Sequence, residues 1–469
     1  MHHAAAVILS VSSMTASCIA QLCDTQGPIE LISANAGAYS SAGYSVAASE
    51  DIVVIGAYRD ERLAIGAGSA AVYRLVAGLW TEEGDLLPPT PGVGDWFGSS
   101  VATDGQRIVV GVPFANTTAP RSGSVVVFQY VTDNGWVVET ELTAPLPQFE
   151  DRFGTSVAID ADRIVVGASQ RNAFGATNAG SAFVYMLEDG AWTFEQELFT
   201  GSVANANAGH TVAIETPHIL VGAPNDDSAA GEDRRGMAYS FQLGETGWGA
   251  ASSLTPEASG ALANYGWSVA INNNTALIGA PDADGTAGTD SGQVTVFELD
   301  ANEWTRTQTL APEFGFSDSF KFGESVAIRH GLAIVGMPGR GNNTGGIVAY
   351  DQQENGSWMT AASEVTVPNG LPVRSFFGTS VAASLIGAVA GADGTDVPDI
   401  NAGSAYFYSA TCPCPGDFDQ NGTLNFFDIT AFIAAYNAGN LAADRAEPFG
   451  VLNFFDISAF ISDFQTSCQ

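Results

Sequence analysis

The chain has 469 residues, of which 46% are hydrophobic and 14% charged, a composition typical of a globular protein and too apolar for a disordered one. Sixteen basic residues stand against 51 acidic ones, which gives a formal net charge of -35. Because so acidic a chain repels phosphate backbones and anionic lipids, we expect no nucleic-acid partner. Beyond the N-terminus no apolar run reaches the roughly 18 residues of a membrane span, so we expect no transmembrane segment.

The N-terminal residues predict export. An apolar stretch from Ala4 to Ala20 leads into small residues around Cys18, the pattern of a secretory signal peptide over residues 1–20. A buried N-terminal strand is the alternative. Removal of this signal leaves an even number of cysteines, which predicts two disulfides with three possible pairings among Cys23, Cys412, Cys414 and Cys468.

A repeated unit dominates the middle of the chain. It reads aromatic-Gly-x-Ser-Val-Ala followed by an aliphatic run ending Gly-Ala-Pro, and it recurs with a period of 55 to 57 residues. The first glycines are Gly43, Gly98, Gly154, Gly209, Gly266, Gly323 and Gly378, and the second glycines are Gly56, Gly111, Gly167, Gly222, Gly279, Gly336 and Gly391. Each unit contains four short β-branched or aromatic segments separated by turn residues. Seven such units predict an all-β fold, a seven-bladed β-propeller.

The seventh unit lacks its own fourth strand. A tryptophan opens the fourth strand of the first six units, at Trp80, Trp136, Trp192, Trp248, Trp304 and Trp358. No such strand follows Ala405–Tyr408, so we predict that Pro28–Ser33 supplies it and closes the ring. This closure would bring Cys23 near Cys412 or Cys414, and we favour a Cys23–Cys412 disulfide.

These signatures resemble FG-GAP repeats, the blades of integrin α-subunit propellers, over about residues 28–409. The resemblance implies a propeller used for binding or adhesion. Integrin-like blades carry a calcium loop between the first and second strands, but here those connections (103–107, 160–163 and 272–275) are short and predict plain hairpins. Six aspartates in second-to-third loops are interpreted as turn residues, with calcium ligation as the alternative: Asp282, Asp284, Asp290, Asp393, Asp396 and Asp399.

A second module, residues 412–469, follows the repeats. Leu424–Ile433 recurs as Leu452–Ile461 at an offset of 28 residues, which predicts a duplicated loop and helix. The first loop has the oxygen spacing of an EF-hand and predicts one Ca²⁺ site formed by Asp417, Asp419, Asn421, the Thr423 carbonyl, Asn425 and Asp428. The second loop has Arg445, Glu447 and Phe449 at the corresponding first positions, so we expect no second site there.

This pattern resembles dockerin modules over residues 415–469. The resemblance implies calcium-dependent attachment to a cohesin-like or other surface protein. It also implies that two phenylalanine pairs, Phe426-Phe427 and Phe454-Phe455, contact that partner, with core packing as the alternative. A Cys414–Cys468 disulfide would join the ends of the module.

Basic residues gather in the loops of one propeller face. The second-to-third and inter-blade loops contain Arg59, Arg62, Arg121, Arg152, Arg171, Arg234, Arg235, Lys321, Arg340 and Arg374. Arginine forks suit sulfate and carboxylate groups, so these residues predict a face for an acidic polysaccharide or a protein ligand. Local pairing with Asp60, Glu61, Asp226 and Asp233 is the alternative.

The sequence therefore predicts a secreted, non-catalytic binding propeller anchored at a cell surface or extracellular assembly. The alternative is a polysaccharide lyase or glycosidase on the same scaffold. No catalytic motif is evident, and the three histidines beyond the signal, His210, His218 and His330, lie in or beside predicted strands as packed or turn residues.

Overall fold

The computed structural model describes residues 28–35, 37–76, 78–201, 203–227, 235–255, 263–284, 288–312, 319–353, 355–360, 367–368, 370–396, 401–409, 426–437, 443, 457–458 and 460–461. The chain separates into two compact units, residues 21–410 and residues 1–20 with 411–469. The expected signal peptide, the four cysteines and the calcium loop up to Asn425 lie outside the described residues. None of the helices in the described ranges is long and apolar enough to cross a membrane.

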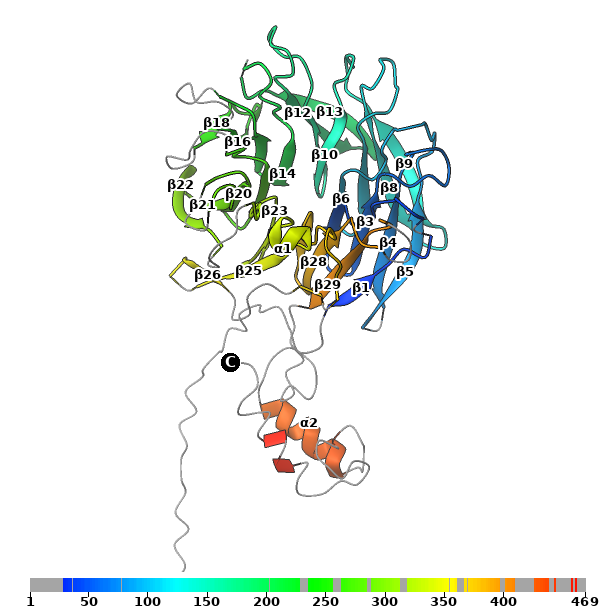
Figure 1. Ribbon diagram of the computed structural model, residues 1–469, viewed down its shortest axis with the longest axis vertical. Coiled ribbons are helices and arrows are strands. Elements are labelled where there is room, and N and C mark those ends of the chain that lie inside the picture. Colours follow the sequence, from blue (N-terminus) through cyan, green and yellow to red (C-terminus); the bar gives the residue numbers. More distant parts are fainter. Residues whose placement is uncertain are drawn as a thin grey trace, which may run out of the picture. The chain divides into compact units, whose positions relative to one another are not determined.

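The first unit consists of seven antiparallel sheets, the blades of a propeller (Figure 1). Blade 1 contains β2 (Ser45–Ala48), β3 (Ile52–Ala57), β4 (Ser69–Val76) and β5 (Leu79–Leu86), and blade 2 contains β6 (Val101–Thr103), β7 (Arg107–Val112), β8 (Ser124–Val131) and β9 (Gly135–Leu142). Blade 3 contains β10 (Phe153–Asp160), β11 (Arg163–Ala168), β12 (Ser181–Glu188) and β13 (Ala191–Leu198). Blade 4 contains β14 (Thr211–Glu215), β15 (His218–Ala223) and β16 (Met237–Gly244), with its fourth strand in two pieces, β17 (Gly247–Trp248) and β18 (Ser252–Leu254).

The remaining blades follow the same order. Blade 5 contains β19 (Ser268–Asn272), β20 (Thr275–Ala280), β21 (Gln293–Asp300) and β22 (Glu303–Leu310). Blade 6 contains β23 (Ser325–Arg329), β24 (Leu332–Gly336), β25 (Ile347–Gln352) and β26 (Trp358–Thr360), with the short helix α1 (Arg340–Asn343) between its second and third strands. Blade 7 contains β27 (Val381–Ser384), β28 (Gly387–Ala392), β29 (Ser404–Ser409) and β1 (Ile29–Leu31).

The hydrophobic core lies between blades. Second strands such as β3 are buried along their whole length, which explains their unbroken aliphatic runs, because both faces pack against neighbouring blades. Fourth strands such as β5 alternate exposed and partly buried residues, as expected at the outer edge. The first strands are innermost and contact one another around the axis.

The N-terminal strand closes the ring, as predicted. β1 pairs antiparallel with β29, with Ile29 opposite Phe407 and Leu31 opposite Ala405. The Tyr406 hydroxyl donates a 2.6 Å hydrogen bond to the Glu30 carboxylate. Blade 7 is therefore built from both ends of the repeat region, which removes two open sheet edges.

The repeated motif is scaffold, and its serine joins neighbouring blades. In six blades this serine donates a hydrogen bond of 2.7 to 2.9 Å to the motif glycine carbonyl of the next blade; the donors are Ser45, Ser100, Ser156, Ser268, Ser325 and Ser380. In blade 4 the methyl group of Thr211 lies where the other blades place the hydroxyl. The glycines allow this approach, because a Cβ on Gly56 would lie 2.0 Å from the Gly98 carbonyl oxygen.

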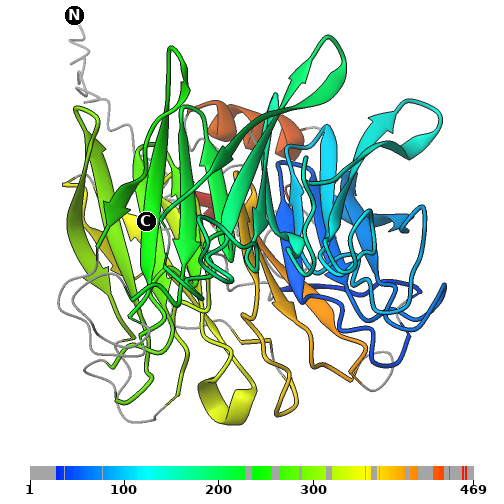
Figure 2. The same cartoon turned by 90° about the horizontal axis from the view of Figure 1, so that it is seen from above.

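The propeller has two different faces, which lie at the lower and upper edges of Figure 2. We call the end with the second-to-third and inter-blade loops, including α1, the loop face; the opposite end carries the strand hairpins. The short connection of 103–107 is a hairpin, as predicted, in which Asp104 Oδ1 accepts hydrogen bonds from the backbone N–H groups of Gln106 and Arg107 at 2.8 and 2.7 Å.

Among its described residues the second unit contains the helix α2 (Phe426–Asn437). Phe432 of α2 stacks on Phe460 with ring centroids 4.0 Å apart. These two phenylalanines occupy the same position in the duplicated segment, so the two copies share one small apolar core. Phe426 and Phe427 lie in the first turn of α2.

Candidate ligand-binding rim on the loop face

Seven side chains surround the propeller axis on the loop face. Each follows the first motif glycine at the entrance to an innermost strand, and they are Tyr44, Ser99, Thr155, His210, Trp267, Glu324 and Thr379. The glycine before each of them is buried, whereas all seven side-chain positions retain exposure to solvent, up to 41% at Tyr44. We call these seven residues the rim.

A constant backbone turn presents the rim. In all seven repeats the residue three positions before the rim residue has a positive φ, between 50° and 62°; these residues are Ser41, Trp96, Arg152, Asn207, Asn264, Lys321 and Phe376. The backbone carbonyl of each of these residues accepts a hydrogen bond of 3.0 to 3.2 Å from the backbone N–H of the rim residue that follows it. Non-glycine residues rarely adopt this conformation, so the turn is enforced by its surroundings while the side chain differs in nearly every blade. The scaffold thus fixes position and leaves chemistry variable.

Aromatic rings follow one another along blades 1 and 2. Tyr44 contacts Tyr58 with centroids 4.4 Å apart, Tyr58 contacts Trp96 at 5.0 Å, and Trp96 contacts Phe114 at 4.4 Å. We call these four residues the aromatic arc. Cationic groups lie over two rings of the arc: Arg59 over Tyr58 at 5.0 Å, and Arg121 and Arg152 over Phe114 at 4.6 and 5.0 Å.

The opposite part of the rim is acidic. His210 packs on Trp267 with centroids 4.4 Å apart, and Trp267 Nε1 donates a 3.1 Å hydrogen bond to Glu324. Nearby, the Asp282 carboxylate is paired with Lys321 and accepts a hydrogen bond from Asn264. Residues from blades 4, 5 and 6 therefore meet in one polar cluster.

Burial changes the proton affinity of these groups. Burial and the nearby Asp282 carboxylate raise the pKa of Glu324 to about 7, and burial raises the pKa of Asp393 in blade 7 to about 6. Burial lowers the pKa of His210 to about 4, so this imidazole is neutral at physiological pH. Near neutral pH the Glu324 carboxyl can both donate and accept hydrogen bonds.

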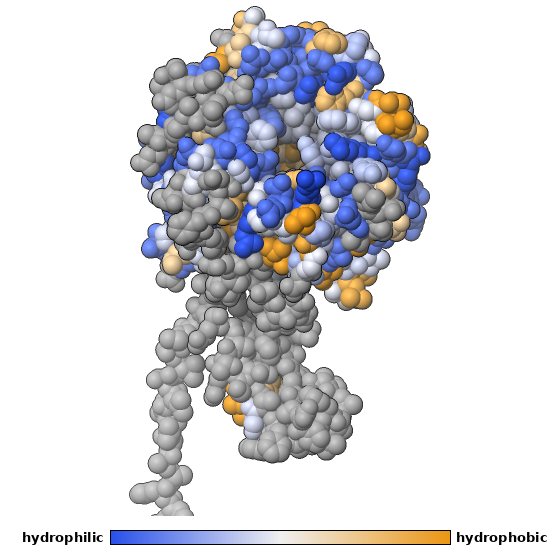
Figure 3. All heavy atoms as spheres, viewed as in Figure 1, coloured by the Kyte–Doolittle hydropathy of each residue, from blue (hydrophilic) through white to orange (hydrophobic). Residues whose placement is uncertain are grey.

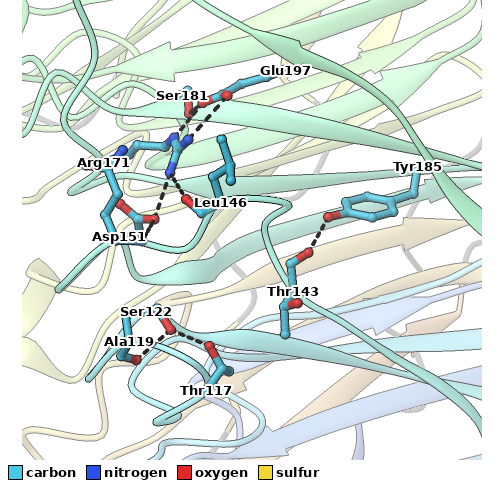
Figure 4. A network of polar contacts seen from close by, with 11 residues as sticks. Thr117, Ala119, Ser122, Thr143, Leu146, Asp151, Arg171, Ser181, Tyr185 and Glu197 are labelled. Atoms are coloured by element: carbon cyan, nitrogen blue, oxygen red, sulfur yellow. Dashed lines mark hydrogen bonds and ion pairs between the residues drawn. The ribbon is translucent and has the colours of Figure 1, made fainter.

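Several basic residues expected to face a ligand are paired locally. Arg62 contacts Asp60 and Asp85, each at 2.5 Å. Figure 4 shows Arg171 between Asp151 at 2.8 Å and Glu197 at 2.6 Å. Arg121 lies 3.1 Å from Glu150. For these residues the structure matches the alternative of local pairing.

Of the arginines expected on the loop face, four have no carboxylate partner among the described residues: Arg59, Arg152, Arg340 and Arg374. Arg235 precedes β16 and is engaged in a contact of its own, and Arg234 lies outside the described residues. Polar residues prevail on the loop face, which Figure 3 turns to the viewer, with apolar patches between them. Arg59 and Arg152 are the unpaired cations beside the aromatic arc.

Two of the loop aspartates act as turn residues. Asp284 Oδ1 accepts a 3.1 Å hydrogen bond from the Asp290 backbone, and Asp396 Oδ1 accepts one of 2.9 Å from Asn401. The neutral amides of Asn116 and Asn172 make the same bond in blades 2 and 3, so a charge is not required. No group of three potential metal ligands occurs within the described parts of the chain, and Asp399 lies outside them.

The rim was not predicted from the sequence, although a signal existed. The residue after the first motif glycine differs between repeats, whereas its neighbours in the motif are nearly constant. A variable residue in a constant turn is where a scaffold presents groups that bind a specific ligand. His210 belongs to the rim, whereas His330 lies in the turn between β23 and β24 with φ 46°.

Comparison with known families agrees with the repeat pattern. The FG-GAP repeat model matches residues 80–128, 136–185 and 248–297. Each match starts in a fourth strand at its tryptophan and ends in the third strand of the next blade. None of the curated proteins searched matches the chain. The first unit is thus a seven-bladed propeller, and three of its stretches are similar to the FG-GAP repeat.

Proposed function

We propose that this protein is a secreted, non-catalytic binding propeller that holds its ligand on the rim and is attached to a cell-surface or extracellular assembly through its C-terminal module. The rim carries this proposal. It offers differing side chains from every blade on one fixed turn, and binding residues concentrate on loops that a rigid scaffold positions.

The proposed ligand is a polysaccharide that carries carboxylate or sulfate groups. Tyr44 and Trp96, the two members of the aromatic arc that are not buried, supply ring surface on which sugar rings pack. Glu324 and Asp393 supply hydrogen bonds to hydroxyl groups. Arg59 and Arg152, which lack carboxylate partners, offer charge-assisted bonds to acidic substituents.

Binding of a uronate polysaccharide and of its methyl-esterified form tests this ligand class. We expect Trp96→Ala to weaken binding of both forms and Arg152→Gln to weaken only the acidic form, by roughly tenfold for one charge-assisted bond. Arg340→Gln is the matched control, because Arg340 lies on the loop face in blade 6, away from the aromatic arc. Absence of binding to either form, or equal behaviour of the three variants, would contradict the proposal.

The C-terminal unit is proposed to bind Ca²⁺ and a surface partner. The oxygen pattern Asp417, Asp419, Asn421, Thr423, Asn425 and Asp428 supports the calcium site, and its last member lies in the first turn of α2. An apolar recess of about 560 Å³ next to the stacked Phe432 and Phe460 supports docking, and Ile433 and Ile461 beside it are 50% and 48% exposed. These isoleucines also occupy equivalent positions in the two copies.

Calorimetric titration of Ca²⁺ into the full chain tests the anchor. We expect one site in the wild type and none in Asp417→Ala, with the unfolding of the propeller unchanged between the two proteins. A wild-type chain that takes up no calcium would remove the dockerin-like anchor and leave the rim as the functional surface.

An enzyme acting on the same polysaccharide is the second candidate. Two carboxyl groups with raised pKa, Glu324 and Asp393, both lie near Tyr44, and such groups are suited to general acid and base catalysis in a lyase or glycosidase. Shortening of the polysaccharide chains by the wild type, lost in Glu324→Gln with binding retained, would favour this function. An unchanged chain length would favour binding alone.

A further inference from the structure

A glutamate recurs where one blade meets the next. The fourth strands of blades 1, 2 and 3 each contain a β-bulge at the same place, and the extra residue is Glu83, Glu139 or Glu195. We call the contact between blade n and blade n+1 a seam. Because the bulge recurs at a spacing of 56 residues, each glutamate faces an equivalent seam.

This glutamate accepts hydrogen bonds from an arginine of its own blade and from a tryptophan of the next blade. In the seam between blades 1 and 2, Glu83 accepts from Arg74 at 2.5 Å and from Trp136 Nε1 at 2.8 Å. In the seam between blades 3 and 4, Glu195 accepts from Arg163 at 3.2 Å and from Trp248 Nε1 at 3.3 Å.

The seam between blades 2 and 3 is a variant of the same arrangement. Glu139 accepts from Arg107 at 2.9 Å, and the Arg107 guanidinium lies 5.7 Å from the ring centre of Trp192. In the seam between blades 5 and 6 a glutamate of the third strand, Glu298, is bonded by Thr275 at 2.9 Å and by Gln352 of the next blade at 3.4 Å. A carboxylate thus occupies all four of these seams.

The seam between blades 4 and 5 lacks this group. Strand register makes His218, opposite Gln242, equivalent to Arg163, opposite Met186. The pairing of Ser240 with Ser252 likewise corresponds to that of Val184 with Gln196. The position before Ser252 is Ala251, where blade 3 has Glu195. Both members of the arginine–glutamate pair are therefore replaced.

A recess of about 560 Å³ lies in this seam, lined by residues of both blades that include His218, Ser240, Gln242, Ser252 and Trp304. His218 is only 7% exposed, its Nδ1 atom has no hydrogen-bond partner, and its ring lies 5.8 Å from that of Trp304. Trp304 Nε1 is also buried without a partner. An unsatisfied buried polar atom is unfavourable, so this seam has unused hydrogen-bonding capacity.

Other features separate this seam from its neighbours. Trp80 Nε1 and Trp192 Nε1 are likewise unpartnered, so the tryptophan alone does not define a site. The recess, the buried His218 and the alanine in place of glutamate occur together here. Burial lowers the pKa of His218, so its imidazole is neutral at pH 7 and donates through one ring nitrogen. Glu303 also lines the recess, and it is exposed.

We propose that the recess between blades 4 and 5 binds a small carboxylate in the place of the missing glutamate side chain, held by Trp304 Nε1 and His218. Ser240, Ser252 and Gln242 line the same space. This site is separate from the rim and does not depend on the proposed function.

Acetate and its neutral isostere acetamide test the proposal on the full chain. The readout is the indole N–H resonance of Trp304 in the ¹⁵N spectrum, assigned by its loss in Trp304→Phe. We expect acetate to shift this resonance saturably, acetamide to leave it unchanged, and Trp248, already bonded to Glu195, to stay unmoved.

Filling the site supplies the decisive comparison. Ala251→Glu should abolish the response to acetate and raise the melting temperature, whereas Ala251→Ser should preserve the response. If Ala251→Glu does not fold, His218→Leu serves as the second variant and should also lose the response. A Trp304 resonance that ignores acetate, that responds equally to acetamide, or that responds undiminished in both Ala251→Glu and His218→Leu would overturn the proposal.

Discussion

Ser380 Oγ donates a 2.7 Å hydrogen bond to the carbonyl oxygen of Gly43, a residue 337 positions earlier in the chain. This bond joins blade 7 to blade 1 in the same way that the other motif serines join consecutive blades. At the outer edge β1 completes blade 7 by pairing with β29. The ring is therefore closed near its axis by the repeated motif and at its periphery by the N-terminal strand.

Because the closing bond is equivalent to the others, its removal should cost no more than theirs. We expect Ser380→Ala and Ser156→Ala each to lower the free energy of unfolding by about 1 kcal/mol, the usual value of one hydrogen bond. Urea denaturation measures both. A much larger loss for Ser380→Ala would identify the junction of blades 7 and 1 as the weak point of the ring.

The second motif glycine is required by close approach between blades. A Cβ on Gly391 would lie 1.9 Å from the Gly43 carbonyl oxygen, and a backbone atom cannot give way as a flexible side chain does. We expect Gly391→Ala to destabilise the propeller by about 1 to 3 kcal/mol, as overpacking usually does. A Cβ on Gly37 would have no heavy atom within 4 Å, so the free energy of unfolding of Gly37→Ala should stay within about 0.5 kcal/mol of wild type. Thermal unfolding of both variants measures the difference.

The number of blades and their closure were predictable because each follows from local spacing. The motif glycines recur with a constant period, and the absence of a tryptophan strand after Tyr408 leaves one vacancy that only Pro28–Ser33 fits. Both predictions are confirmed by the pairing of β1 with β29. Local patterns suffice here because each blade is a meander of neighbouring strands.

Side-chain partners that are distant in sequence, within and between blades, were not predictable in the same way. His210 and Trp267 meet on the rim although 57 residues separate them, and Arg171 reaches Asp151 and Glu197 on either side of it. Such contacts depend on the angle between blades and on rotamers, which repeat spacing does not encode. The disulfides and the calcium loop stay predictions, since they lie outside the described residues.

Glutamine side chains clamp the outer strands of two blades. Gln308 donates to the Trp358 carbonyl and accepts from its backbone N–H, both at 2.8 Å, and Gln196 does the same for Trp248. The clamped strands β26 and β17 are short, so these bonds replace part of the missing ladder.

We expect Gln308→Ala to lower stability by about 1 to 3 kcal/mol and to speed amide exchange at Trp358 before it affects other blades. Gln106→Ala is the control, because Gln106 is exposed in the hairpin between β6 and β7 of blade 2 and belongs to a different part of the ring. Unchanged exchange at Trp358 would mean that water replaces the amide without loss.

The rim carboxyl of Glu324 should make stability depend on pH. Its pKa rises from 4.5 to about 7 on folding because of burial and the nearby Asp282, so between these values the folded protein binds more protons than the unfolded chain. This contribution is present in full below about pH 4.5 and is lost as the pH rises through 7. Stability attributable to Glu324 thus falls from acidic to neutral pH, opposite to a carboxylate held in an ion pair.

Glu324→Gln isolates this effect, since glutamine keeps the shape and remains neutral. We expect the variant to match wild type near pH 4.5 and to be the more stable protein at pH 8, with unfolding followed by denaturant titration at both values. Glu188→Gln, an exposed residue in a hairpin, should leave the difference between the two pH values unchanged. A wild type that outperforms Glu324→Gln at pH 8 would show instead that the ionised carboxylate is stabilised at the rim, by Lys321 or by Trp267 Nε1, more strongly than burial opposes it.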